Sequence, residues 1–242
     1  MERRTFVEPR SVFSTLFLLF ACMPVLSEDG FTALFNGKDL SGWTTKTGDW
    51  RVEEGTLVLK SAGDHIMKNS SYLWVEGMYG DFVLELDYMV TEAVLYGSLP
   101  RLGGRGAGAN SGVFIRVEDR ADPVQTGIEI QIGNVDPGGQ LERGTVGGIF
   151  DLVPPKLNMH KPGEWNHYRI TCKGSGINVE LNGRETASAD LNQWKTARQN
   201  PDGTPNKFRR PLKEFARRGY IGLQDHGTPA AFRNIRIKVL DR

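Results

Sequence analysis

The sequence predicts an all-β protein in which two antiparallel sheets pack face to face. Short runs of alternating apolar and polar residues recur along most of the chain, as expected of strands that bury one face. Glycine is abundant at 29 residues, and aromatic residues make up 10% of the 242-residue chain. This composition is typical of many short strands joined by tight turns, and the near absence of helical periodicity favours a sandwich.

The predicted strands follow one another from residue 32 onward, and turn signals separate them. Glu54-Gly55 and Asn182-Gly183 have the residue types of hairpin turns, and a third hairpin closes near Gly174. The predicted strand segments are 32–35, 50–52, 56–60, 81–90, 111–117, 127–132, 164–172, 177–181, 219–224 and 232–238.

Two segments lack strand patterning. Residues 96–109 are rich in glycine, and no helix pattern follows them, so a surface loop is favoured over a phosphate-binding loop. Residues 190–218 are polar and irregular, with one helical turn expected around residues 212–217. We expect this second segment to form a rim loop over a site.

The first 27 residues have the pattern of a signal peptide. Three arginines precede an apolar run at residues 12–21, which is too short to span a bilayer comfortably. Cleavage before Glu28 would leave a single domain of residues 28–242 without a transmembrane span, exported to the periplasm or the extracellular space. A lipoprotein signal ending at Cys22 is the alternative.

Charge and cysteine content exclude further classes. The chain carries 30 basic and 29 acidic residues, so it lacks the basic excess that nucleic-acid binding needs. Cys172 is the only cysteine after the signal sequence, which leaves the exported chain without an internal disulfide. Its strand-like surroundings indicate a buried, inert thiol. No sequence feature indicates a protein partner.

One predicted strand holds the first candidate site residues. Alternation places Ile128, Ile130 and Ile132 in the core between the sheets, so Glu129 and Gln131 share the opposite face. On the concave side of a curved sandwich, these two side chains would form part of a polar binding floor. The alternative is an ordinary solvated outer face.

A second candidate group surrounds Arg116, which alternation places on one face with Gly112 and Phe114. Arginine beside a carboxylate on a neighbouring strand can bind an anion or a hydroxyl group, or it can form a plain cross-strand salt bridge. Asn110 comes just before this strand and is a further candidate for substrate binding, with a simple turn role as the alternative.

The third group lies in the turn between the last two predicted strands. Gln224, Asp225 and His226 follow one another there, and Arg233 is close in sequence. Histidine titrates near neutral pH and can move protons or bind a metal. Asp225 could orient the imidazole, ligate a cation or cap the turn.

Several familiar catalytic patterns are missing from the sequence. There is no CxxC or HExxH spacing for zinc and no G-x-S-x-G nucleophile elbow. Glu129 begins an E-x-D-x-E pattern, but Gln131 and Gly133 occupy the later positions. This strand therefore lacks the second carboxylate of ordinary glycoside hydrolysis.

Six short motifs follow one another along nearly all of the chain after the signal sequence. They are LFNGKDLSGW at 34–43, NSGVFIR at 110–116, GIEIQ at 127–131, KPGEWN at 161–166, GLQDHG at 222–227 and FRNI at 232–235. In this order they resemble the 3-keto-disaccharide hydrolase family. The resemblance implies a concanavalin- or laminarinase-like jelly-roll sandwich, in agreement with the strand pattern.

The resemblance also implies an activity, the cleavage of 3-keto-glycosides or 3-keto-disaccharides by an exported carbohydrate-active enzyme. A ketone at C3 acidifies the C2 proton; a base removes it, the enolate expels the C1 substituent, and water adds afterwards. Glu129 or His226 would transfer the proton. The residues implied in substrate binding are Asn110, Arg116, Gln131, Gln224, Asp225 and Arg233.

The implied reaction requires no certain cofactor. It leaves open whether a divalent cation acts as a Lewis acid, with Asp225 or His226 as a ligand. The choice between a lyase and a full hydrolase is open as well.

A non-catalytic glycan-binding module is the competing function for a jelly roll. Such a module would expose aromatic platforms, which Trp43, Trp74 or Trp194 would have to supply. An enzyme would instead gather ionisable groups in one site. In both cases the partner is a small carbohydrate or glycoside.

Overall fold

The computed structural model describes residues 29–46, 50–60, 71–90, 109–133 and 140–240. These residues form two antiparallel sheets with one apolar core between them. The structure confirms the predicted all-β jelly-roll sandwich. The predicted signal peptide with Cys22, and most of the glycine-rich segment 96–109, lie outside the described residues.

The larger sheet has eight strands. They are β1 (Thr32–Ala33), β3 (Trp50–Glu53), β4 (Thr56–Leu59), β6 (Phe82–Val90), β9 (Asn166–Lys173), β10 (Gly176–Leu181), β11 (Arg184–Asp190) and β13 (Ala230–Val239). Their order is β11-β10-β9-β6-β13-β4-β3, and β1 pairs with β13. The C-terminal strand β13 therefore lies inside the sheet, between β6 and β4.

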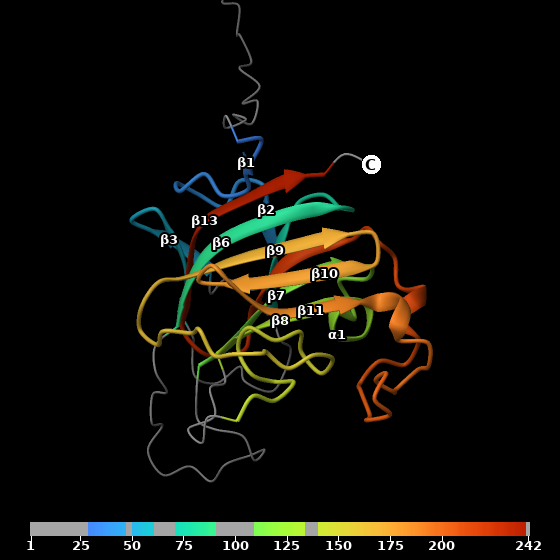
Figure 1. Cartoon of the computed structure of the whole chain (residues 1–242). Coiled ribbons are helices and arrows are strands. Elements are labelled where there is room, and N and C mark those ends of the chain that lie inside the picture. Colours follow the sequence, from blue (N-terminus) through green and yellow to red (C-terminus); the bar gives the residue numbers. More distant parts are fainter. Residues whose placement is uncertain (1–28, 47–49, 61–70, 91–108, 134–139, 241–242) are drawn as a thin grey trace, which may run out of the picture.

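The smaller sheet has five strands. They are β2 (Trp43–Thr45), β5 (Ser71–Val75), β7 (Asn110–Val117), β8 (Ile128–Gly133) and β12 (Tyr220–Asp225). Their order is β2-β5-β12-β7-β8, so β12 is the central strand. Figure 1 shows β7 and β8 behind the larger sheet, whose strands β6, β9 and β10 run across the front.

Two strands of the smaller sheet escaped prediction. β2 has three residues, which is too short for a visible pattern. β5 places Leu73 and Val75 in the core and Tyr72 and Trp74 on the other face. Because large side chains cover both faces of this strand, its sequence shows no apolar–polar alternation.

Helical structure is brief. A four-residue helix, α1 (Pro123–Thr126), precedes β8, and two single 3₁₀ turns, η1 (Leu191–Gln193) and η2 (Leu212–Glu214), lie in the predicted rim segment. The second turn falls where one helical turn was expected. No helix within the described ranges is long and apolar enough to cross a membrane.

The core confirms the predicted alternation. Alternate residues of β6, from Phe82 to Val90, and the three isoleucines of β8 belong to one buried cluster. Cys172 lies in the same cluster as a free thiol, and its burial raises the pKa to about 12. Such a thiol is almost entirely protonated at neutral pH, in agreement with the predicted inert cysteine.

A β-bulge in β7 overturns the face predicted for Arg116. Tyr220 pairs with Val117 and Gly222 pairs with Phe114, so two residues of β7 oppose one residue of β12. Arg116 is the inserted residue, with a left-handed φ of 51°. The alternation slips by one position there, and Arg116 does not share a face with Phe114.

Arg116 instead ties the two sheets together. It is 1% exposed, and its guanidinium group donates to the carbonyl of Gly174 at 2.7 Å, in the turn between β9 and β10. It also donates to the carbonyl of Gly80 and lies 3.2 Å from Oδ1 of Asp81. Oδ1 of Asp81 accepts the Gly174 amide at 3.0 Å as well. The guanidinium group is thus engaged in structural contacts and is not available on the face predicted for substrate.

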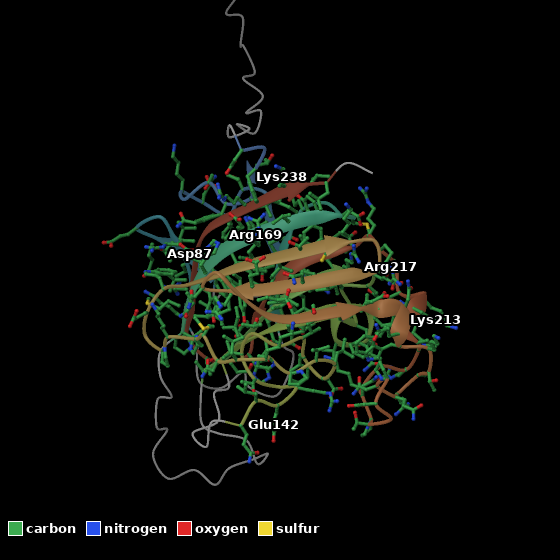
Figure 2. All side chains as sticks on the ribbon, in the orientation of Figure 1. Asp87, Glu142, Arg169, Lys213, Arg217 and Lys238 are labelled. Atoms are coloured by element: carbon green, nitrogen blue, oxygen red, sulfur yellow. The ribbon has the colours of Figure 1, made fainter. Side chains whose placement is uncertain are left out.

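Arg233 also lies away from the predicted site, on the outer face of the larger sheet. Its strand neighbour Phe232 is in the core, and Arg233 pairs with Asp87 on the outer face of the larger sheet. The guanidinium group stacks 4.0 Å from the centroid of the Trp165 ring. Figure 2 shows Asp87 and Arg169 on this face, toward the viewer. Arg233 therefore lies on the opposite side of the sandwich from Glu129.

Replacing Arg116 with methionine should lower the free energy of unfolding by about 3 kcal/mol, because one partner of a buried ion pair is lost. Lysine should restore part of this loss, since an ammonium group cannot reproduce the several bonds of a planar guanidinium group. Urea unfolding measures both effects. The control is Arg209→Met, which breaks an exposed pair with Asp122 and should cost below about 1 kcal/mol. Equal effects of the two methionine variants would contradict the structural role.

Candidate functional site

A row of aligned residues crosses the outer face of the smaller sheet. Trp74 of β5 pairs with Gly222 of β12, Gly222 pairs with Phe114 of β7, and Phe114 pairs with Glu129 of β8. The chain neighbours of all four residues belong to the core, so the row faces away from it. We call this surface the Glu129 face.

Two glycines make room for the row. A Cβ atom on Gly112 would lie 2.7 Å from Oε1 of Glu129, and one on Gly222 would lie 2.5 Å from the Trp74 ring. Both separations are shorter than van der Waals contact. A larger residue at either position would displace the carboxyl group or the indole, so the two glycines define where these side chains lie.

The Glu129 carboxyl group is buried, with 6% of the residue exposed. Burial raises its pKa to about 7, and the nearby Lys207 ammonium group acts in the opposite direction. Nζ of Lys207 lies 3.7 Å from Oε2 of Glu129. At neutral pH both protonation states of the carboxyl group are therefore populated, which suits a group that accepts and returns a proton.

Two glutamines on the Glu129 face offer buried hydrogen-bond acceptors. Gln131 is 1% exposed and Gln224 is 5% exposed. Nε2 of Gln131 donates to Oδ1 of Asn110 at 2.9 Å. Within the described part of the chain, Oε1 of each glutamine has no hydrogen-bond partner. A buried acceptor without a partner is costly, and hydroxyl groups of a bound ligand would satisfy both.

Aromatic rings continue the Glu129 face beyond the carboxyl group. The rings of Tyr72 and Trp74 are stacked with centroids 5.0 Å apart, and Phe114 meets Tyr72 edge-on at 5.0 Å. These residues form a small apolar cluster separate from the main core. The rings are largely covered, since Tyr72 and Trp74 are each 7% exposed and Phe114 is fully buried.

The backbone of β8 is held from two directions. The Tyr168 hydroxyl group, from β9, donates to the carbonyl of Gln131 at 2.6 Å and accepts the Gly147 amide at 2.8 Å. On the edge of the strand, the Phe150 amide donates to the carbonyl of Glu129 at 2.9 Å. Phe150 also lines a cavity of about 580 Å³, which lies between residues 141–154 and residues 204–205 of the rim segment. This volume is within the range of ligand pockets.

The turn that contains His226 follows the end of β12. Asp225 Oδ1 accepts the Gly227 amide at 2.9 Å, which fits the turn-capping alternative. Thr228 Oγ1 accepts the Asn110 amide at 2.8 Å and donates to the Asn110 carbonyl at 2.7 Å. This turn is therefore fastened to the start of β7, which separates β12 from β8. His226 is half-buried, and none of these contacts links it to Glu129.

In the described part of the chain, few side chains could ligate the divalent cation that the sequence leaves open. Among the residues that the structure describes, no group of three or more His, Cys, Asp or Glu side chains is placed to hold a metal ion. Asp225 and His226 are adjacent in one turn, and within the described ranges no third such side chain joins them there. We therefore derive no step through a metal.

The three candidate aromatic platforms are all buried. Trp43 is 6% exposed, Trp74 is 7% exposed and Trp194 is 4% exposed. The indole groups of Trp43 and Trp194 donate to the Leu34 carbonyl and to Oδ1 of Asn200, each at 2.8 Å. These contacts are those of core residues, and they disfavour a binding module built on exposed tryptophans.

Lys207 is a site residue that sequence reasoning missed. It belongs to the irregular segment 190–218, which was expected to form a rim over a site, but no local pattern singles it out among the basic residues there. Its place beside Glu129 depends on contacts between segments far apart in the chain.

The protein is a jelly-roll sandwich with a polar, partly aromatic site on the outer face of its smaller sheet. This combination is typical of carbohydrate-active proteins. The chain belongs to the family of the 3-keto-alpha-glucoside-1,2-lyase-like domain, whose model matches residues 30–238. This confirms the family resemblance found in the sequence motifs.

Known relatives agree with the family. The chain is 25% identical to a 3-keto-disaccharide hydrolase from Bacteroides thetaiotaomicron, over 88% of this chain and 79% of that protein. The crystal structure of a candidate glycosyl hydrolase from Parabacteroides distasonis matches 87% of this chain and 99% of its own, with 29% identity and a TM-score of 0.71. A second structure from that organism matches with 24% identity and a TM-score of 0.66, over 90% of this chain and 99% of its own. Family and relatives support a carbohydrate hydrolase-like function.

Replacing Gly112 with alanine should destabilise the protein by about 1–3 kcal/mol, because the new Cβ overpacks against the Glu129 side chain. In a Glu129→Ala background the same change should cost little, since the clashing atoms are gone. Urea unfolding of the four proteins of this cycle measures the coupling. Gly80→Ala is the control, because its Cβ would meet nothing nearer than 3.8 Å. An additive cycle would contradict the close approach.

Proposed function

We propose that this protein cleaves 3-keto-glycosides by removing the proton at C2 and eliminating the C1 substituent, with later addition of water. The observation that carries the proposal is the Glu129 carboxyl group, buried on the Glu129 face with a pKa of about 7. A base of this strength is matched to an acidified C–H bond at neutral pH. The family of the chain and the name of its relative point to the same substrate class.

The proposed reaction uses one base where ordinary glycoside hydrolysis uses two carboxylates. Glu129 takes the C2 proton, and the electron pair of the broken C–H bond moves into the enolate and then expels the C1 oxygen. The leaving oxygen needs a proton, for which His226 is the proposed donor. A single buried carboxyl group suits this route, because β8 carries Gln131 where a second acid would stand.

The substrate-binding role falls to the amides of the Glu129 face. Gln131 and Gln224 present buried acceptors for sugar hydroxyl groups, and Asn110 orients Gln131 through its 2.9 Å hydrogen bond. Arg116 and Arg233 take no part in this proposal, because their guanidinium groups are engaged elsewhere in the sandwich.

Incubation of the purified protein with a 3-keto-glucoside and with its unoxidised parent tests the proposal. Cleavage of the keto form alone is expected, since only the ketone acidifies the C2 proton. A parallel incubation with chelator measures whether a divalent cation contributes. Binding of glycans without cleavage of either compound would contradict the proposal and favour the non-catalytic module.

Replacing Glu129 with glutamine should lower kcat/KM for the keto substrate by about 10²–10⁴-fold, the usual contribution of a general base. In the wild-type protein, kcat/KM should rise with pH through about 7, as the carboxyl group loses its proton. The control is Glu214→Gln, which changes an exposed carboxyl group of η2. A fully active Glu129→Gln protein would remove this residue from the mechanism.

We also propose that the protein is exported after cleavage before Glu28, because arginines precede a short apolar run at its N-terminus. Expression of the full chain in a bacterial host, followed by intact-mass analysis, should give a product that begins at Glu28. A lipid-modified product that begins at Cys22 would support the lipoprotein alternative. The Cys22→Ser variant should be processed normally under simple export.

A further inference from the structure

The rim segment that carries Lys207 is folded around a buried amide. Asn200 is 3% exposed, and its Oδ1 accepts the Trp194 indole N–H at 2.8 Å. Its Nδ2 donates to Oγ1 of Thr204 and to the carbonyl groups of Pro205 and Asp151. This polar loop is therefore fixed to the segment 147–153, which lies along the edge of β8 and which we call the edge segment.

The backbone of Lys207 is held on both sides. Its amide donates to Oδ2 of Asp151 at 2.6 Å, and its carbonyl accepts from Nε2 of Gln125 at 3.1 Å. Asp151 follows Phe150, whose amide pairs with the carbonyl of Glu129. The position of the lysine is thus coupled through a short chain of contacts to the strand that carries the carboxyl group.

The Lys207 side chain is directed onto the Glu129 face. Its exposed fraction is 17%, and Nζ lies 4.5 Å from the centroid of the Phe150 ring and 5.2 Å from that of Phe208. The same nitrogen is 3.7 Å from Oε2 of Glu129. Two aromatic faces stabilise the cation while shielding it from water, which strengthens its attraction for the carboxylate.

We propose that Lys207 is a positioning residue that keeps the Glu129 carboxyl group ionised and oriented to receive the substrate proton. This inference rests on the proposed function. It assigns the lysine a role through Glu129, with no contact to substrate required.

The charges around the pair favour this role. From β7, the neighbours of Glu129 are Gly112 and Phe114, which carry no charge, and from the edge segment its neighbour is Phe150. Burial raises the pKa of Glu129, and Lys207 acts to lower it. Burial lowers the pKa of Lys207, and the carboxylates of Glu129 and Asp151 oppose that shift.

The test compares the pH dependence of kcat/KM in Lys207→Met and Lys207→Arg with that of the wild-type protein. In the methionine variant the pKa of Glu129 should rise, so the acid limb of the profile should move up by about 1–3 pH units. Activity at pH 7 should then fall about tenfold or more and recover at higher pH. The arginine variant should keep the limb near its original position.

A matched control and a second neutral variant separate charge from folding. Lys213, exposed in the same rim segment and labelled in Figure 2, supplies the control Lys213→Met, which should leave the profile unchanged. Lys207→Gln should behave as the methionine variant does, and near-UV circular dichroism checks that each variant is folded. A folded, neutral variant that loses activity without a shift of the acid limb would overturn the inference.

Direct titration of Glu129 by carbon-13 NMR, without substrate, distinguishes this inference from the proposed reaction. A higher midpoint in Lys207→Met supports the inference even if the wild-type protein fails to cleave a 3-keto-glucoside, in which case the proposed function alone falls. An unchanged midpoint in the folded variant overturns the inference whatever the activity.

Discussion

A buried carboxyl group must be compensated by its protein surroundings, and this constraint organises the Glu129 face. Glu129 reaches its place because Gly112 leaves the space that a side chain would fill. Its pKa stays near neutrality because one cation, on a loop from a distant part of the chain, opposes the effect of burial. The position of the Glu129 carboxyl group therefore depends on Gly112, and its charge depends on Lys207.

The two outer faces of the sandwich use polar residues in opposite ways. On the larger sheet, Glu85 is paired with both Arg169 and Arg236, and Asp87 accepts hydrogen bonds from Asn234 and pairs with His167. These contacts pair the two carboxylates with neighbouring side chains on the same face. On the smaller sheet, two buried amide oxygens lack partners in the described structure. Among the described residues, the larger sheet thus pairs these carboxylates internally, whereas the smaller sheet keeps two buried amide acceptors available to a ligand.

The sequence predicts those parts of this arrangement that depend on local alternation. The strand pattern gives the two sheets, and the isoleucines of β8 direct Glu129 and Gln131 to the other face, as the structure has them. Alternation fails where a strand contains an extra residue. The bulge at Arg116 reverses that side chain, and only the pairing of β7 with β12 reveals the slip.

Other features depend on contacts that no local pattern encodes. Arg233 follows the GLQDHG motif closely in sequence, yet the chain passes from one sheet to the other between them, so the two lie on different layers. Lys207 reaches Glu129 from across a gap of nearly eighty residues, through bonds to Asp151 and Gln125. Such positions can be found only once the sheets and the rim segment are assembled.

The strand order has a consequence for the folding of the protein during its synthesis. The last two strands of the chain, β12 and β13, occupy interior positions, one in each sheet. The smaller sheet needs β12 to join β5 to β7, and the larger sheet needs β13 to join β6 to β4. A chain that terminates before Tyr220 loses a middle strand from both layers at once. The sandwich, and with it the Glu129 face, therefore cannot form before the residues of β12 and β13 have been synthesised.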